Sequence, residues 1–144
     1  MPLLKIWIHL VWATKSRAPV LTKDTLEKIC KHIKENGSKK GIHVDFINGY
    51  DDHLHCLISL KAEQTIAKVV QLLKGESSFW ANKNNICKEK LAWQDEYFAV
   101  SVSESGVDRV REYIKNQEEH HRKKTFRQEY DDFMNKYGFE LIKG

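Results

Sequence analysis

Residues 51–60 of this 144-residue chain alternate in character with the two-residue period of a β-strand. Because successive side chains of a strand point to opposite faces, His53 and His55 leave the same face of the predicted sheet. Two neutral imidazoles placed in this way form half of a metal site, although ordinary satisfied histidines explain the pattern equally well. The opposite face is an unbroken apolar set that fits a hydrophobic core, made of Leu54, Cys56, Ile58 and Leu60.

The first half of the chain predicts a strand, a helix and a hairpin in succession. A strand over residues 6–13 precedes a helix that has Thr22 as its N-cap and stops at Asn36-Gly37. A second strand over residues 42–47 forms a hairpin with the histidine strand. Its alternation places three apolar residues on one face, namely Ile42, Val44 and Phe46.

The middle of the chain predicts a second helix and a fourth strand. The helix starts near Gln64 or Thr65, and Gly75 and Ser77-Ser78 interrupt its pattern, although Phe79 and Trp80 indicate that the helix or a second short turn continues. The fourth strand covers residues 97–103, with alternating apolar and small side chains.

The C-terminal part predicts two further helices. Ser105 can cap the first of them, which ends by Thr125. The spacing Thr125-x-x-Gln128 then predicts a capping box for a fourth helix, which Gly138 terminates. The apolar side of this fourth helix consists of Phe126, Tyr130, Phe133, Met134 and Tyr137.

The order βαββαβ predicts an α+β fold of the ferredoxin-like or RRM-like type, with an antiparallel four-stranded sheet and additional C-terminal helices. Strands one and three are the central neighbours in that sheet, which puts the two histidines in its middle. No repeat or linker divides the chain, so we expect a single domain over residues 1–144. The histidine face needs a cover, and the third helix or a partner subunit can provide it.

Net charge, cysteine content and the N-terminal segment indicate the kind of partner and the cellular compartment. The net charge of +4 favours a polyanionic partner over a cationic one. The three cysteines are scattered without a Cys-x-x-Cys pair, which indicates neither a disulfide framework nor a thiolate zinc site and fits a reducing cytoplasm. The apolar run near the N-terminus has no signal-peptide cleavage pattern and is too short to span a membrane.

The third predicted helix carries the other chemically suggestive side chains. Tyr113 and Gln117 are one turn apart, and if their side of the helix covers the histidine face, a phenol and an amide oxygen meet the two imidazoles. A packing tyrosine and a solvated glutamine are the alternative. The basic run over residues 120–124 is either a solvated helix end or a grip for phosphates.

Four segments together resemble the HUH single-tyrosine transposases of the smallest insertion sequences, and also the REP-associated tyrosine transposases. They are the Asp-Asp-His-Leu-His-Cys-Leu-Ile-Ser-Leu run of residues 51–60, Trp-Ala-Thr-Lys-Ser-Arg at 12–17, Val-Gln-Leu-Leu-Lys-Gly at 70–75, and residues 112–126 with their Tyr-x-x-x-Gln and basic tail. The resemblance covers nearly the whole chain in the right order. One departure is the segment 93–99, which lacks the glycines that many relatives have there.

The resemblance implies a DNA transposase that cleaves and rejoins hairpin-containing single-stranded DNA through a covalent 5′-phosphotyrosine. Tyr113 would be the nucleophile, and His53, His55 and Gln117 would hold Mg²⁺ or Mn²⁺. It further implies a homodimer in a cytoplasmic, nucleoid-associated setting. The DNA contacts that we expect come from basic residues in the shared segments: Lys15, Arg17, Lys74, His120, Arg122, Lys123 and Lys124.

Two neutral imidazoles and an amide would leave the charge of the metal uncompensated by the protein. We therefore expect weak metal binding without DNA, and loss of activity near pH ~6.5 if the histidines have ordinary pKa values.

Other functions fit the sequence less well. A nucleotide-binding histidine triad needs a third alternate histidine, but Leu57 stands there, and two-histidine phosphoesterases need a second His-x-Thr/Ser strand. The alternatives kept are a non-catalytic RRM-like nucleic-acid-binding domain and a domesticated relative. An RRM-like binder would display stacking aromatics on its central strands, whereas strand three offers histidines.

Overall fold

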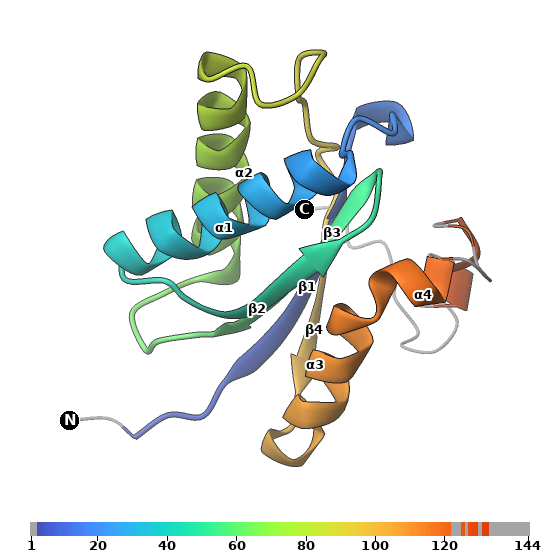
Figure 1. Ribbon diagram of the computed structural model, residues 1–144. Helices are drawn as coiled ribbons and strands as arrows, with labels where there is room; N and C mark the ends of the chain where they lie inside the picture. Colours follow the sequence, from blue (N-terminus) through green and yellow to red (C-terminus); the bar gives the residue numbers. More distant parts are fainter. Residues whose placement is uncertain (1–2, 122–124, 126, 130, 133–144) are drawn as a thin grey trace.

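The computed structural model describes residues 3–121, 125, 127–129 and 131–132 (Figure 1). Four antiparallel strands form one sheet in the order β2-β3-β1-β4, which confirms the predicted α+β fold with strands one and three in the centre. The strands are β1 (Trp7–Ala13), β2 (His43–Gly49), β3 (His53–Ser59) and β4 (Phe98–Val102). The helices are α1 (Lys23–Lys39), α2 (Ile66–Lys83), α3 (Val107–Lys115) and α4 (Gln117–His121), with short 3-10 turns η1 (Lys15–Arg17) and η2 (Glu104–Gly106).

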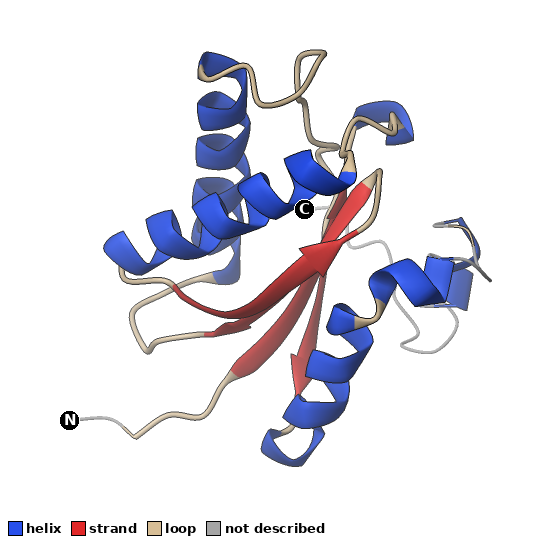
Figure 2. Cartoon of the chain, viewed as in Figure 1, coloured by secondary structure: helices blue, strands red, loops and turns tan. Residues whose placement is uncertain are grey.

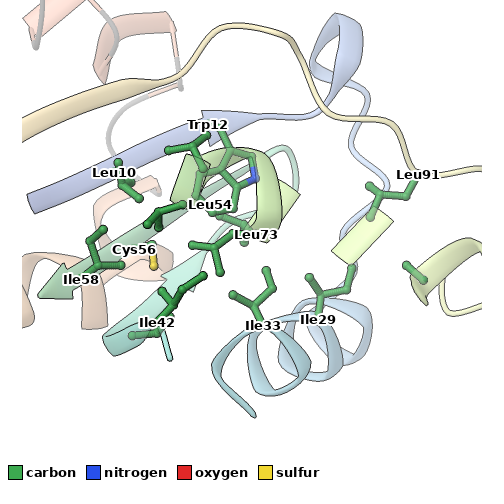
Figure 3. Close-up of a cluster of buried hydrophobic side chains, with 14 of the residues drawn as sticks. Leu10, Trp12, Ile29, Ile33, Ile42, Leu54, Cys56, Ile58, Leu73 and Leu91 are labelled. Carbon is green, nitrogen blue, oxygen red and sulfur yellow. The ribbon is translucent and has the colours of Figure 1, made fainter. Parts of the chain in front are cut away.

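The two faces of the sheet are covered by different helices. Figure 2 shows α1 and α2 on one face and α3 and α4 on the other. The main core lies between the sheet and the first pair, where side chains of the central strands meet those of α1 and α2 (Figure 3). The labelled core residues from the sheet include Leu10, Trp12, Leu54, Cys56 and Ile58, and those from the two helices are Ile29, Ile33 and Leu73. Among the described helices, none combines the length and the apolar character needed to cross a membrane.

A β-bulge in β2 overturns one predicted pattern. The pairing of β2 with β3 shifts register between Val44 and Phe46, so an extra residue lies between two paired positions. Val44 therefore packs in the main core, whereas Phe46 packs on the other face against the cluster that includes Leu57 and Val107. The prediction that Val44 and Phe46 share a face was wrong, because simple alternation does not hold across a bulge.

The first two helices begin where predicted, and α1 continues further than predicted. The side chains of Thr22 and Thr65 cap α1 and α2 by accepting hydrogen bonds from backbone N–H groups of the first turn. However, α1 runs through Asn36-Gly37 to Lys39, because Gly37 lies against β2 where a larger residue would crowd its neighbours. Of the two continuations predicted after Gly75, a continued helix or a second short turn, α2 has the continued helix, since a single glycine weakens a packed helix without ending it.

The C-terminal helices differ more from the prediction. Gly106, not Ser105, is the N-cap of α3, which follows directly on η2. The predicted long third helix is in fact two, because α3 ends at Lys115 and α4 begins at Gln117. The capping box is confirmed: the Thr125 backbone N–H donates to Gln128 Oε1 over 2.9 Å, and the Gln128 N–H donates to Thr125 Oγ1 over 3.2 Å. The predicted apolar side of the following helix (Phe126, Tyr130, Phe133, Met134, Tyr137), together with its stop at Gly138, lies outside the described residues.

Candidate metal and tyrosine site

His53 and His55 lie side by side on the face of β3 that α3 and α4 cover, and neither ring is exposed to solvent. Each ring is held at Nδ1 by a neighbour. His53 Nδ1 is 2.8 Å from Asp52 Oδ1, and His55 Nδ1 is 2.9 Å from Nε2 of His9 on β1. A partner at Nδ1 fixes a ring and turns Nε2 toward the centre of the site, as in histidines that bind metals.

The third member of the cluster is Glu129, whose buried carboxylate lies between the two imidazoles. Its Oε1 is 2.9 Å from His55 Nε2, and its Oε2 is 3.4 Å from His53 Nε2 and 2.8 Å from His121 Nε2. One ligand atom from each of His53, His55 and Glu129 lies within 4.8 Å of the others, which is a spacing that can hold a metal ion. Two imidazole nitrogens and a carboxylate are also a donor set that divalent cations accept.

Sequence reasoning missed three of these side chains. Glu129 follows the predicted capping box, but nothing in the linear pattern shows that this turn folds back over the sheet. His121 was considered only as part of the basic run over residues 120–124, either a solvated helix end or a grip for phosphates, whereas its imidazole faces Glu129 and stacks on Tyr50 with ring centroids 5.0 Å apart. His9 could have been found, because its place in the alternation of β1 puts it on the histidine face.

Burial and neighbouring charges give the histidines of the site different pKa values. Burial alone would lower the pKa of His53, but the carboxylates of Asp52 and Glu129 outweigh it and raise the pKa to about 9. Burial lowers the pKa of His55 to about 4, with Glu129 acting in opposition. Burial and the neighbouring His55 lower the pKa of His9 to about 3, so His9 is neutral. Of these three histidines, His53 is the one that carries a proton charge at neutral pH.

The carboxylate of Glu129 remains ionised. Burial alone would raise its pKa, but hydrogen bonds from His121, His53 and His55 hold the pKa of Glu129 well below its usual range. A buried anion among imidazoles is the counter-charge that a divalent cation would need there.

Tyr113 and Gln117 both reach this cluster from the same chain. The Tyr113 hydroxyl donates a hydrogen bond to Glu129 Oε1. Gln117 Oε1 is 3.3 Å from His53 Nε2, while Gln117 Nε2 donates to the Tyr113 carbonyl over 3.1 Å. The structure thus brings together the four residues that the resemblance selected as nucleophile and ligands.

The end of α3 is held by a side chain of β2. The side chain of Asn48 on β2 donates to the carbonyl oxygens of Ile114 and Lys115 over 3.1 and 3.2 Å. These carbonyls belong to the last turn of α3 and have no partner further along that helix, so the asparagine satisfies them where the helix ends. Gln117, one turn after Tyr113, then starts α4 and is fully buried.

An ion pair fixes α3 across the sheet. The guanidinium of Arg111 donates to both carboxylate oxygens of Asp45 over 2.7 and 2.9 Å. Asp45 follows Val44, whose side chain lies in the main core, so Asp45 is on the face of β2 that α3 covers, and the hydrogen bond from Arg111 lowers the pKa of Asp45. The ion pair therefore ties α3, which carries Tyr113, to the edge strand β2.

The predicted DNA contacts lie in different surroundings. Lys15 and Arg17 are exposed on η1, beside the end of β1. The Lys74 ammonium instead donates to the backbone carbonyls of Gln94 and Asp95, the latter over 3.1 Å. The other residues of that prediction lie outside the described part of the chain or have undescribed side chains: His120, Arg122, Lys123 and Lys124.

Fold and site together define an α+β protein with a buried histidine–carboxylate cluster and a tyrosine hydroxyl on the same side of the sheet. The model of the family described as "Transposase IS200 like" matches residues 3–117. The chain belongs to this family, and it is a DNA transposase.

Individual relatives agree with this assignment. The ISDra2 transposase TnpA of Deinococcus radiodurans is 30% identical over 116 residues, which cover 76% of this chain and 81% of that protein. A crystal structure from Deinococcus radiodurans R1, described as a transposase, has a TM-score of 0.63 at 26% identity and covers 81% of this chain and 93% of its own. The structure of a REP-associated tyrosine transposase bound to a REP hairpin has a TM-score of 0.57 at 15% identity, and the match covers 84% of this chain and 72% of that chain. At this identity the match shows a similar fold.

Proposed function

We propose that this transposase cleaves and rejoins hairpin-containing single-stranded DNA through a covalent bond between Tyr113 and a 5′-phosphate. The hydrogen bond from the Tyr113 hydroxyl to Glu129 carries this proposal, because the same carboxylate contacts His53 and His55. A phenol next to a cluster that can hold a metal is what nucleophilic phosphoryl transfer requires.

His53 and His55 would hold Mg²⁺ or Mn²⁺ through their Nε2 atoms, with oxygens of Gln117 and Glu129 as further ligands. Carboxylate and amide oxygens suit these hard cations, and a partner at each Nδ1 leaves Nε2 for the metal. When bound, the ion supplies a Lewis acid that withdraws charge from the scissile phosphate. The carboxylate of Glu129 would add a negative charge to the uncharged ligand set of the resemblance, so we now expect the free protein to bind metal more tightly than an all-neutral set would.

Tyr113 performs the bond exchange. Its oxygen forms a bond to the scissile phosphorus, and the bond from that phosphorus to the 3′-oxygen breaks, which gives a 5′-phosphotyrosine and a free 3′-hydroxyl. Glu129 already accepts the hydrogen bond of the phenol and is placed to take its proton. Because a phenolate with a solution pKa near ~10 is a competent leaving group, a 3′-hydroxyl can reverse the step without ATP. The outcome is strand transfer without net hydrolysis.

The partner that we infer is a DNA hairpin next to a single-stranded cleavage site. A fold relative was solved with a REP hairpin, and the net charge of +4 suits a polyanion. Lys15 and Arg17 would contact phosphates near the end of β1, and Lys74 would support the 94–95 segment beside them. We further propose that residues 1–144 act as one domain, that two copies form a homodimer, and that the protein works on DNA in the cytoplasm, at the nucleoid.

A covalent-adduct assay tests this function. Labelled hairpin-containing single-stranded DNA is incubated with the protein and Mn²⁺ and analysed on denaturing gels. We expect a protein–DNA adduct that Tyr113→Phe and His55→Ala abolish. Tyr97→Phe is the matched control, because Tyr97 lies on the surface just before β4. An adduct that survives in Tyr113→Phe would refute the assignment of the nucleophile.

A further inference from the structure

A cavity of about 250 Å³ lies beside the end of β1, next to the apolar cluster on which Tyr113 packs. Its floor comes from the histidine face of the sheet, and its rim comes from η1 and the segment before β4. Its lining includes Val11, Ala13, Ser16, Gln94, Glu96 and Phe98.

The cavity shares a wall with the tyrosine. Val11, Ala13 and Phe98 line it, and the same three residues form the small apolar cluster against which Tyr113 packs. When a phosphate of a DNA strand lies at the Tyr113 hydroxyl, an adjacent nucleotide of that strand can therefore reach this cavity.

The backbone around the rim is held in an unusual shape. Ser16 and Arg17 are consecutive non-glycine residues with φ of 57° and 54°, in the left-handed region that such residues rarely adopt. The Ser16 backbone N–H donates to Gln94 Oε1 over 3.2 Å, and the Gln94 N–H donates to the Ala13 carbonyl over 2.8 Å. Strained backbone of this kind persists where the surroundings impose it, and it concentrates at ligand sites.

We propose that this cavity binds one unpaired nucleobase of the single-stranded DNA, next to the phosphate that Tyr113 attacks. This proposal rests on the function proposed above. Its volume is smaller than the roughly 300 to 1,000 Å³ of sites for drug-sized ligands, which suits a single base.

The chemistry of the lining selects a base over a phosphate. Phe98 offers an aromatic surface, on which unstacked bases of single strands commonly stack. Gln94 donates through Nε2 when Oε1 is taken by Ser16, and the Glu96 carboxylate accepts, so the rim can contact the polar edge of a base. The negative charge of Glu96 disfavours a phosphate at the same place, whereas the cation of Arg17 beside it suits the backbone of the strand.

The test separates base contacts from backbone contacts. Binding is measured by fluorescence anisotropy in the Tyr113→Phe protein with EDTA, so that no chemistry takes place. The first probe is a labelled mixed-sequence single strand of about 12 nucleotides, a length within the usual range of site sizes. The second probe has the same backbone with abasic sugars throughout. The variants are Gln94→Ala and Phe98→Leu, and the controls are Gln71→Ala and Phe79→Leu on α2, of which Phe79 is highly exposed.

We expect Gln94→Ala and Phe98→Leu to bind the base-containing strand more weakly, by roughly fivefold or more for the loss of stacking on Phe98. Both should bind the abasic strand as before, and the controls should change neither affinity. Unchanged affinity for the base-containing strand in both variants would overturn the proposal. An equal loss for the abasic strand would also overturn it, because the effect would then lie in the backbone or the fold.

Two further measurements keep the outcome unambiguous. Thermal melting identifies a misfolded variant, and if Phe98→Leu does not fold, Gln94→Ala alone decides, since Gln94 is exposed. The adduct assay of the unmodified chain runs in parallel. An adduct with unchanged base binding in the variants refutes the pocket and leaves the strand-transfer function intact. Base-dependent losses without any adduct support the pocket and count against Tyr113 as nucleophile.

Discussion

Competition between a proton and a metal ion at His53 gives a quantitative prediction. The pKa of His53 in the metal-free protein is about 9, because the carboxylates of Asp52 and Glu129 outweigh burial. At neutral pH His53 is therefore charged, and a metal that binds its Nε2 must displace a proton. The pKa of His55 is about 4, so His55 has no proton to release.

The expected size of the effect follows from this single proton. Each pH unit below the pKa of His53 costs about a factor of ten in metal affinity. Mn²⁺ affinity should thus rise about tenfold per unit between roughly pH 6 and 8, and binding should release about one proton per ion. With ordinary histidines, as the sequence expectation of activity loss near pH ~6.5 assumed, the affinity would level off above that pH.

Isothermal titration calorimetry measures both quantities. Titrations of Mn²⁺ into the protein in two buffers with different ionisation enthalpies give the affinity and the number of protons released. Asp52→Asn removes one carboxylate from His53, so its proton release should shift to lower pH, while Asp24→Asn on α1 serves as a control far from the site. An affinity that does not change with pH, without proton release, would refute the reasoning.

The metal-free protein should show the opposite trend in stability. The raised pKa of His53 means that its ion pairs with Asp52 and Glu129 stabilise the folded state fully below pH ~6.5. This contribution is lost as the pH rises through about 9. Denaturant unfolding in EDTA at a series of pH values measures it, and stability that increases over this range would contradict the prediction.

Three further predictions concern the scaffold. Leu10→Ala removes a fully buried side chain from the main core and should lower the free energy of unfolding by about 2 to 5 kcal/mol, as measured by urea denaturation. Gly49→Ala should prevent correct pairing of the hairpin, since a Cβ there would lie 2.1 Å from the His53 carbonyl oxygen. We expect an altered circular dichroism spectrum and a lower melting temperature, and an unchanged melting temperature would contradict the prediction. Asp45→Asn should destabilise the fold at neutral pH. Because Arg111 holds the pKa of Asp45 below its ordinary value, the benefit of the ion pair is lost only as the pH falls through that lowered pKa and the carboxyl is protonated; a cost of the substitution that does not shrink on acidification, measured by urea denaturation, would argue against the ion pair.

The sequence predicted the sheet well because each central strand follows a strict two-residue period. The alternation of β3 placed its histidines on one face and its apolar residues in the core, as observed. Thr22 and the capping box of Thr125 and Gln128 were also predicted, since the hydrogen bonds of a cap involve residues only three apart. The β2 bulge was missed, because an inserted residue changes the face of everything that follows it.

For the site, the linear sequence determined the pair His53 and His55, and the family resemblance added Tyr113 and Gln117. Only the tertiary structure decided that these four meet in one chain and that Glu129 lies between them. The physical reason is that a helix break and a returning turn depend on distant partners. Asn48 satisfies the end of α3 from another strand, and the histidines attract the carboxylate of Glu129 from 74 and 76 positions away in the chain. Local periodicity carries no information about contacts of this range.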